Sequence, residues 1–404
     1  MAERKFEVIK GGLNMPPHIA KMSFVSAYTT DTRLMGVVGL YIHWVLTYSG
    51  SEEEVDFHQF FYFETEEFGL EEYYSIKGND MYTISQMENS LFGGLGGVQV
   101  DLTEKEARYM IQLFVKYNKE NKIPLPAEGK SEYLFLIEPE IVLSAKERKT
   151  VMTKMCTEIE NEYQAIHYFL MRVFGKDFIG AAFLMKGNMF LHQFEKLPIS
   201  TLCLNTIDEH YDKDGKLSYL AESVLDCGDY YYITISELTV DESLAVTSFT
   251  ARSSFKISSM EAAMKLRRPE FMTIYSMSVH PARFETECTN ITDRAIGTVY
   301  DNGKLYMILN THNNHVKERV FRLSNDVTGL YYISNYGQLI ATAYSLNDIY
   351  LLEREVRKSS IGYAFTAIAK YEFKEPLLYE FINSDFDDFD DFLDVIRDDL
   401  NEDE

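Results

Sequence analysis

The sequence predicts a protein of the α+β class: a strand-rich N-terminal region, a long central helix, a predominantly antiparallel β C-terminal domain and an acidic amphipathic C-terminal helix. Three observations support this prediction. Aromatic residues make up 14% of the 404-residue chain, including 28 Tyr and 27 Phe, which favours strands. Residues 199–373 show period-two alternation between turn signals. Three apolar helical patterns follow a Ser or Thr with Glu three residues later.

The chain is longer than one average domain, so we expect several structural segments. These are an N-terminal α+β domain at 1–125, a central helical segment at 130–198, a β-rich antiparallel domain at 199–376 and an acidic amphipathic tail at 384–404. The polar stretch 118–132 contains Pro124 and Pro126 and is the best candidate for a linker or long loop.

The N-terminal segment contains a strand pattern followed by a glycine-rich stretch and a helix. VDFHQFFYFE, Val55 to Glu64, is aromatic at both alternating sets of positions, which predicts a strand buried on both faces. FGGLGGVQV, residues 92–100, lacks the glycine spacing of a dinucleotide-binding loop and no GK[ST] follows, so we expect a turn or bulge. Thr103 and Glu106 then form a capping box that begins a helix.

The central segment predicts a short strand and then a long helix. Tyr133 to Ile137 is a short apolar run that we interpret as a strand. Ser144 and Glu147 form a second capping box, and one face stays apolar as far as Gly175. The resulting helix would have about 30 residues and a length of about 45 Å. A helix of this length is typical of a domain spine or an interdomain strut.

The clearest hairpin is TVYDNGKLYMIL, residues 298–309. Asn302 and Gly303 are expected to form its two-residue type I′ turn, because both tolerate positive φ. On this interpretation Gly303→Val destabilises the fold, because a β-branched residue resists positive φ. One helix interrupts the strands: it begins at the capping box of Ser258 and Glu261 and ends in cations before Pro269.

The charge balance restricts the partners of this protein. The formal net charge is −24, which argues against direct binding to nucleic acids or anionic membranes and fits cationic partners. The start of the chain lacks the apolar region of a signal peptide, and the four cysteines are scattered. We therefore expect a cytoplasmic protein with reduced thiols and without a membrane segment.

One loop resembles part of a calcium-binding loop but is incomplete. In HYDKDGKLSYLAE, residues 210–222, Asp212, Asp214 and Ser218 fall at ligand positions three, five and nine when Gly215 takes position six. The position that needs a bidentate Glu holds Ala221. We interpret the segment as a polar hairpin turn, with these three residues as the metal-ligand candidates, and expect no cofactor and no metal requirement for folding.

Histidines in the β-rich segment are the first candidates for catalysis. His312 and His315 lie in THNNH just after a strand, and His280 precedes Pro281. Two imidazoles three residues apart can bind a metal together with a distant acid, although solvated loop residues show the same pattern. If the chain is a hydrolase or a metal-dependent enzyme, we expect its site around His280, His312 and His315.

The C-terminal segment SDFDDFDDFLDVIRDDLNEDE, residues 384–404, combines acids with large apolar residues. It contains nine Asp, two Glu and one Arg, a net charge of −10. On a helix capped by Ser384, one apolar stripe recurs at spacings of three and four. The stripe consists of Phe386, Phe389, Leu393, Ile396 and Leu400. Such a helix is unstable alone, because its acids repel one another, so it needs an apolar groove, preferably with a basic rim.

The sequence is compatible with several functions. The leading hypothesis is a non-enzymatic interaction or regulatory protein whose tail docks on its own body, for example near Lys265, Arg267 and Arg268, or on a protein partner. A nucleic-acid mimic and a solubilising tail are further interpretations of the same segment. The alternatives to an interaction protein are the enzyme described above and a small-ligand binding module with an aromatic pocket, such as one lined by residues 230–232, Tyr-Tyr-Tyr.

Overall fold

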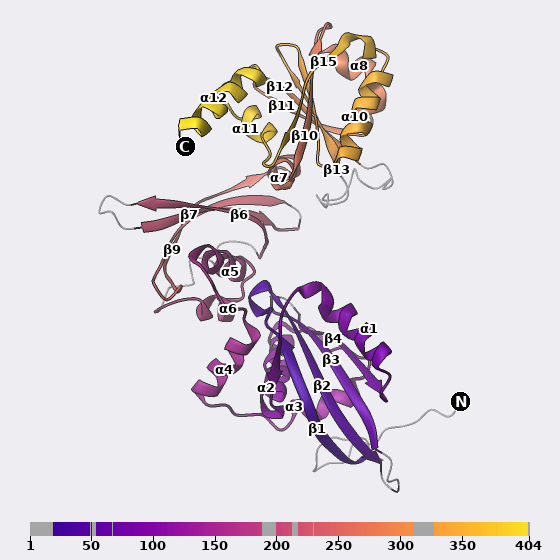
Figure 1. The fold of residues 1–404 in the computed structure, drawn as a ribbon, viewed down its shortest axis with the longest axis vertical. Coiled ribbons are helices and arrows are strands. Elements are labelled where there is room, and N and C mark those ends of the chain that lie inside the picture. Colours follow the sequence, from indigo (N-terminus) through magenta and orange to yellow (C-terminus); the bar gives the residue numbers. More distant parts are fainter. Residues whose placement is uncertain are drawn as a thin grey trace. The chain divides into compact units, whose positions relative to one another are not determined.

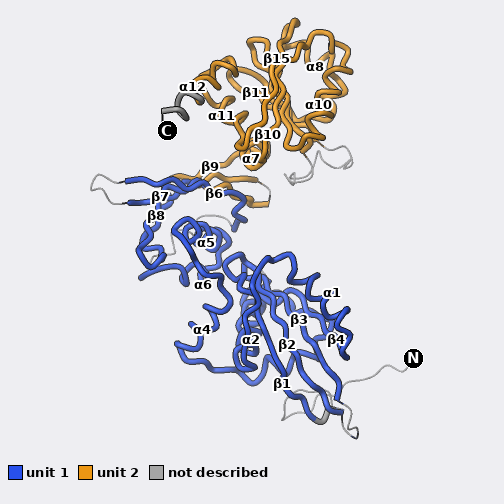
Figure 2. Tube along the Cα trace, viewed as in Figure 1, with its two compact units in different colours: residues 1–222, 235–252 blue, residues 223–234, 253–404 orange. Residues whose placement is uncertain are grey.

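The computed structural model describes residues 19–402, except for 49, 51–53, 67, 188–198, 212–216, 229 and 310–326 (Figure 1). It confirms the α+β class: helices accompany three sheets, and the ladders of the five- and six-stranded sheets are antiparallel throughout. The chain forms two compact units (Figure 2). Unit 1 comprises residues 1–222 and 235–252, and unit 2 comprises residues 223–234 and 253–404.

The largest sheet of unit 1 has the strand order β4-β3-β2-β1-β5. Its strands are β1 (Ile19–Thr30), β2 (Val37–Tyr48), β3 (Glu54–Glu64), β4 (Gly69–Lys77) and β5 (Gln99–Leu102). β3 is the predicted aromatic strand, and residues of both its faces are buried, which confirms that prediction. Consecutive strands are neighbours in β1 to β4, and β5 returns to pair with the free edge of β1.

Helices cover both faces of this sheet. The helices of unit 1 are α1 (Met81–Phe92), α2 (Glu104–Asn121), α3 (Lys130–Ile137), α4 (Ala145–Met155), α5 (Glu162–Phe174) and α6 (Phe178–Phe183). Side chains of α2, α3 and α4, among them Phe114, Tyr133 and Val151, share the main apolar core with one sheet face. On the opposite face, Ile84 and Phe92 of α1 pack against Phe60 of β3. The predicted capping boxes of α2 and α4 are both present.

Two predictions for the central segment were wrong. The run 133–137 lies in helix α3, where Tyr133 and Leu136 are completely buried; a short, fully apolar run has no periodicity that distinguishes a strand from a buried helix. The long helix is interrupted after Met155. Cys156 forms an antiparallel bridge with Thr32, and the Asn161 side chain accepts a hydrogen bond from the Gln164 N–H and so begins α5 as a separate helix.

A network of buried ion pairs connects the turn between β1 and β2 with helices α5 and α6 in unit 1. The guanidinium of Arg33 pairs with Asp177, the cap residue of α6, and both side chains are almost completely buried. Arg172 of α5 reaches the same carboxylate and also Glu66. Burial opposes ionisation of Asp177, but the Arg33 charge and hydrogen bonds outweigh it and lower the pKa of this carboxyl. Removal of one partner would leave an uncompensated buried charge.

A four-stranded meander supplies residues to both units. Its strands are β6 (Thr201–Tyr211), β7 (Leu217–Asp226), β8 (Tyr231–Val240) and β9 (Val246–Ile257), in that order. The boundary between the units therefore passes through β7, β8 and β9, each of which contributes residues to both.

Unit 2 contains a six-stranded sheet with the order β11-β12-β13-β14-β10-β15. Its strands are β10 (Glu270–Met277), β11 (Ala295–Tyr300), β12 (Gly303–Leu309), β13 (Val327–Ser334), β14 (Gln338–Ala343) and β15 (Phe365–Phe373). Its helices are α7 (Ser259–Leu266), α8 (Arg283–Glu287), α9 (Thr289–Thr292), α10 (Leu346–Lys358), α11 (Leu378–Ile382) and α12 (Phe389–Glu402). Helices α8, α9 and α10 lie on one side of the sheet, and α11 and α12 lie on the other (Figure 1).

The predicted hairpin is present as β11 and β12, but its turn differs from the prediction by one residue. Tyr300 pairs with Gly303, so the turn residues are Asp301 and Asn302. Neither Asn302 nor Gly303 has positive φ, which excludes a type I′ turn at these positions. Gly303 is instead restricted by close packing: a Cβ atom there would lie 2.4 Å from the carbonyl oxygen of Ile333.

Candidate functional site

The C-terminal helix α12 packs its apolar side against unit 2 itself. Phe389 is completely buried, and its ring centroid lies 5.1 Å from that of Phe381 in α11 and 6.3 Å from that of Phe373 in β15. Phe392 and Leu393 are also buried. Aromatic pairs in offset or edge-to-face contact add to the free energy gained from burial of their area. The docking surface is therefore made by α11 and by one end of the six-stranded sheet.

Polar contacts fix the start of α12. The Asp388 carboxylate accepts hydrogen bonds from the N–H groups of Asp390 (2.8 Å) and Asp391 (3.3 Å), which is the geometry of an N-cap. The Gln338 amide donates to Asp388 (2.8 Å) and accepts from the Phe389 N–H (3.3 Å). The expected cap at Ser384 was wrong: its hydroxyl donates to the Phe381 carbonyl at the end of α11.

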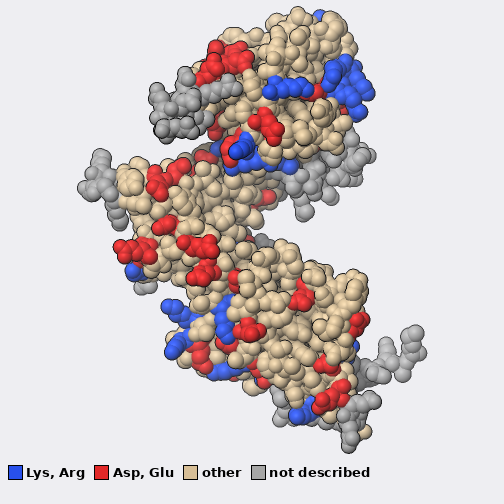
Figure 3. Space-filling model, viewed as in Figure 1, with Lys and Arg blue, Asp and Glu red and all other residues tan. Residues whose placement is uncertain are grey.

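The opposite side of α12 carries acids. Asp390 and Asp391 are exposed, and Figure 3 shows acidic side chains gathered over the start of this helix. Of the remaining stripe residues, Phe386 is half-buried against Phe392, and Ile396 is half-buried. The side chain of Leu400 lies outside the described residues.

The three cations proposed as a basic rim have other partners. Arg268 pairs with Glu375 at 2.6 Å. Lys265 lies over the Tyr379 ring of α11, and Arg267 lies over the Tyr344 ring. Arg268 and Lys265 thus contact the segment that leads to α12.

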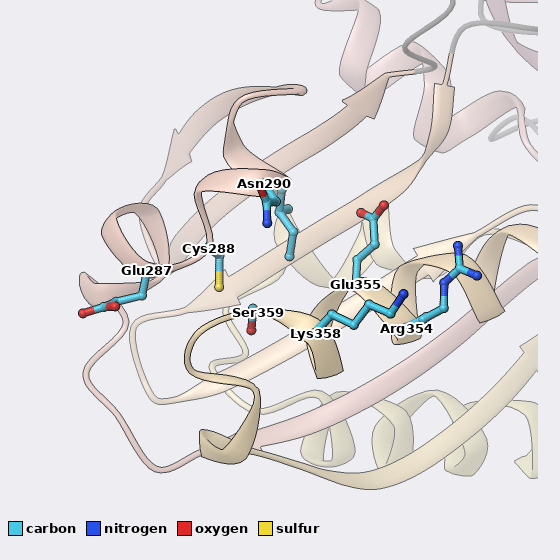
Figure 4. A pocket seen from close by; sticks show the side chains of 8 residues that line it. Glu287, Cys288, Asn290, Arg354, Glu355, Lys358 and Ser359 are labelled. Carbon is cyan, nitrogen blue, oxygen red and sulfur yellow. The ribbon is translucent and has the colours of Figure 1, made fainter.

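A second candidate is a cavity of about 200 Å³ in unit 2, between α10 and the α8–α9 segment (Figure 4). Its lining residues are Glu287, Cys288, Asn290, Ile291, Arg354, Glu355, Lys358 and Ser359. Figure 4 shows Arg354 and Lys358 extending from α10, with Asn290 facing them from α9. The Cys288 sulfur points toward Ser359, and the Glu287 side chain points away from the cavity.

The acidic side chains that line this cavity have ion-pair partners, whereas two basic side chains have none among the described residues. Glu355 pairs with Arg294, and Glu287 pairs with Arg283. Among the described residues, Arg354 and Lys358 have no ion-pair partner, and Lys and Arg side chains gather over α10 (Figure 3). Burial raises the pKa of the Cys288 thiol, so it stays protonated at neutral pH and is a poor nucleophile. The cavity fits binding of a small anion better than nucleophilic catalysis.

Of the three predicted catalytic histidines, only His280 belongs to the residues that the structure describes. His280 is exposed, and its Nδ1 accepts a hydrogen bond from the Ala282 N–H at 3.2 Å. His312 and His315 lie outside the described residues, and so do Asp212 and Asp214 of the loop considered for calcium. Ser218 is buried in β7, where its hydroxyl donates to the His210 carbonyl (3.2 Å).

The three consecutive tyrosines do not line one pocket. Tyr231 is buried, whereas Tyr230 and Tyr232 are half-buried and contact each other with ring centroids 5.4 Å apart. Lys256 lies over the ring of Tyr230, with 4.5 Å between Nζ and the centroid. This alternation is that of a strand, in which neighbouring side chains point to opposite faces.

Sequence reasoning missed a third cluster, which consists of His43, Asp56 and His58 on the sheet of unit 1. One potential ligand atom of each residue lies within 4.8 Å of those of the other two. No short motif indicates this cluster, because His43 belongs to β2 and the other two belong to β3. The only signal is the strand pairing, which places His43 directly opposite His58.

Comparisons with protein-family models, curated proteins and solved structures found no match. Among the described residues, no helix combines the length and apolar character needed to cross a bilayer. The chemistry of the three clusters is therefore the basis for any functional conclusion.

Proposed function

We propose that the protein is a cytoplasmic, non-enzymatic interaction protein that holds its C-terminal helix on its own body and presents the acidic side of that helix to a cationic protein partner. The observation that carries the proposal is the division of α12 into two sides. Phe389, Phe392 and Leu393 are buried against unit 2, whereas Asp390 and Asp391 are exposed, although Asp390 also accepts a hydrogen bond from the Tyr371 hydroxyl (3.2 Å).

Docking in cis changes how the helix would recognise a partner. An apolar stripe that is already covered is not available to a groove on another protein, so charge is the remaining attraction. A fixed acidic surface steers cationic partners and aligns them without the entropy cost of ordering a free tail. Such contacts weaken as salt increases, because exposed charges more than about 10 Å apart are screened at 0.1 M ionic strength.

The proposal is tested by affinity capture from the native lysate with four forms of the protein. These are the wild type, a truncation that removes 384–404, the double variant D390N/D391N and the variant Phe389→Asp. We expect the wild type to retain a partner that is lost on truncation and lost as salt is raised from 50 to 500 mM. The double variant should lose the partner while α12 stays docked, as measured by hydrogen exchange.

The variant Phe389→Asp distinguishes the two sides of the helix. It places a charge in an apolar contact and so releases α12. If a released helix captures the partner more strongly, and in a manner that resists salt, the partner binds the apolar stripe and the proposed cis arrangement is an inhibited state. If all four forms capture the same proteins, the tail has no role in recognition.

A second candidate function is binding of a small anion in the cavity of unit 2. It is favoured by Arg354 and Lys358, one helical turn apart, which lack ion-pair partners among the described residues. Guanidinium and ammonium groups at this spacing suit a phosphate or carboxylate group, and the Asn290 side-chain amide adds a further donor.

This second function is tested with inorganic phosphate, pyrophosphate and citrate as probes. Calorimetric titration of the wild type should give saturable binding that the double variant R354Q/K358Q abolishes. A matched control is Arg357→Gln on the same helix, where the guanidinium already pairs with Glu353 at 3.1 Å. Equal affinity in wild type and double variant would rule the cavity out as an anion site.

A further inference from the structure

The cluster of His43, Asp56 and His58 combines three metal-ligand side chains on one face of a rigid sheet. His43 and His58 are cross-strand partners, and Asp56 lies two residues before His58 on the same strand. Side chains two residues apart on a strand share a face, so all three point to the face that α1 covers in part. The Nε2 of His43 lies 2.6 Å from Oδ1 of Asp56.

We propose that these three side chains form a binding site for a divalent transition-metal ion, with Zn²⁺ as the reference ion. Two imidazoles and one carboxylate are a ligand set that suits Zn²⁺, Co²⁺ and Ni²⁺ and disfavours Mg²⁺ and Ca²⁺, which prefer oxygen ligands. The site lies in unit 1 and is independent of the C-terminal helix and of the function proposed above.

The hydrogen bonds around His58 support this assignment. Its Nδ1 lies 2.7 Å from the hydroxyl of Tyr41, and its Nε2 is buried and makes no hydrogen bond of normal geometry among the described residues. A metal-binding histidine is usually held by a hydrogen bond at its second nitrogen, which fixes the tautomer and the ring direction. A buried nitrogen without a partner costs free energy that a metal ion would recover.

Stacked rings hold the two imidazoles in place. The ring centroids of His43 and His58 are 4.4 Å apart with an interplanar angle of 16°, and those of Tyr41 and His58 are 5.9 Å apart with an angle of 20°. Donor atoms around a tetrahedral Zn²⁺ are separated by about 3.3 Å, as follows from bonds of about 2.0–2.1 Å. Metal binding therefore requires the imidazoles to tilt out of the parallel stack and the 2.6 Å contact between His43 and Asp56 to open.

The site is open on one side. The side chains of His43 and Asp56 are 19% and 26% exposed, whereas His58 is buried. Three protein ligands leave one tetrahedral position, which water would occupy. This is the arrangement of zinc sites that exchange a ligand, as opposed to closed structural sites with four protein ligands.

The proposal is tested by titration of the full chain with Zn²⁺ and Co²⁺ after chelation and buffer exchange. We expect one equivalent of each ion to bind at micromolar or lower concentration and to raise the melting temperature. The Co²⁺ complex should show visible d–d bands without thiolate-to-metal charge transfer, which separates this site from the four cysteines. Millimolar Mg²⁺ should not compete.

Variants identify the ligands. His43→Gln and Asp56→Asn change partly exposed side chains and should abolish binding while the far-UV CD spectrum stays unchanged. Tyr41→Phe keeps all three ligands but removes the hydrogen bond to His58, so affinity should fall about 10- to 100-fold. His280→Gln, in unit 2, is the matched control and should bind as the wild type does.

Two results would overturn the proposal. One is the absence of Zn²⁺ or Co²⁺ binding to the wild type at 100 µM ion. The other is binding that persists at wild-type affinity in both His43→Gln and Asp56→Asn, which would place the ion elsewhere in the chain.

Discussion

The variant Phe389→Ala tests the docking of the C-terminal helix most directly. Phe389 is completely buried between α11 and β15, so loss of its ring removes contacts that the surroundings replace only in part. Truncation of a buried Phe to Ala costs about 3–5 kcal/mol. Ala is also the best helix former, so the change weakens packing and leaves the intrinsic stability of the helix intact or higher.

This free energy converts into a measurable change in opening. At 1.4 kcal/mol per factor of ten, a cost of 3–5 kcal/mol raises the ratio of undocked to docked helix by roughly 100- to 4,000-fold. Amide hydrogen exchange in 389–402 should accelerate by a similar factor, because exchange in a rapidly reclosing element follows its opening equilibrium. The amides of β12 and β13, remote in sequence, report whether unit 2 remains folded.

The control is Asp391→Asn, which changes an exposed carboxylate on the same helix. Exposed substitutions of this kind alter stability by no more than about 0.5 kcal/mol, so exchange should change less than about threefold. Equal exchange rates in Phe389→Ala and wild type would show that α12 is not held by this contact and would remove the support for the proposed function.

Four further outcomes follow from the same structure. Asp388→Ala should cost about 0.5–2 kcal/mol of helix stability and Ser384→Ala much less, because Asp388 is the N-cap of α12. Amide hydrogen exchange in α12 measures both effects, and a larger effect of Ser384→Ala would favour a cap at Ser384. Gly303→Val should give unit 2 a much lower thermal midpoint than Gly297→Ala does. A Cβ atom at position 303 would lie 2.4 Å from a backbone oxygen of β13, whereas a Cβ atom at position 297 would lie 3.2 Å from the side chain of a flexible lysine. Equal thermal midpoints for the two variants would contradict this packing argument. Burial raises the pKa of Glu270 to about 7, so the folded state binds a proton more tightly than the unfolded state does. The free energy of unfolding should therefore fall as pH rises from about 4.5 to 7 and then level off. Glu270→Gln should flatten this pH dependence in urea titrations, and an unchanged slope would exclude Glu270 as its source. EDTA should leave the far-UV CD spectrum intact, because apolar cores hold the strands that carry the proposed metal ligands; loss of the spectrum on chelation would refute this.

Local signals in the sequence determined where several elements begin. The capping boxes at Thr103, Ser144 and Ser258 each start a helix at the predicted position, because both hydrogen bonds of a capping box join residues only three apart. The aromatic strand β3 and the hairpin of β11 and β12 were also predictable, since alternation and turn residues are local features. These signals require no knowledge of distant parts of the chain.

The predictions from sequence were wrong where a contact between residues distant in the chain determines the local structure. The apolar pattern after Ser144 continues past Met155, but the bridge between Cys156 and Thr32 ends the first helix, and only the folded chain brings Thr32 there. In the hairpin, the pairing with β13 shifts the turn by one residue and restricts Gly303 by packing instead of by φ.

The amphipathic composition of the C-terminal segment was evident from sequence, whereas its docking surface and cap were not. Periodicity identifies which residues of the helix must be buried, but the residues that bury Phe389 are Phe373 and Phe381, which belong to other elements. The N-cap is Asp388 and not the predicted Ser384, because the side-chain amide of Gln338 on β14 donates a hydrogen bond to the Asp388 carboxylate.

The chain by itself determined the composition, the charge and the local starts of helices, because these depend on residues that are neighbours in sequence. Only the tertiary structure decided which side chains meet. His43 and His58 are fifteen positions apart, and their approach depends on the register of β2 and β3. Register is set by the buried face of the whole sheet, and a slip of β3 by one residue against β2 would turn His58 to the face opposite His43. A site built across strands is therefore a property of the fold, and short sequence motifs do not reveal it.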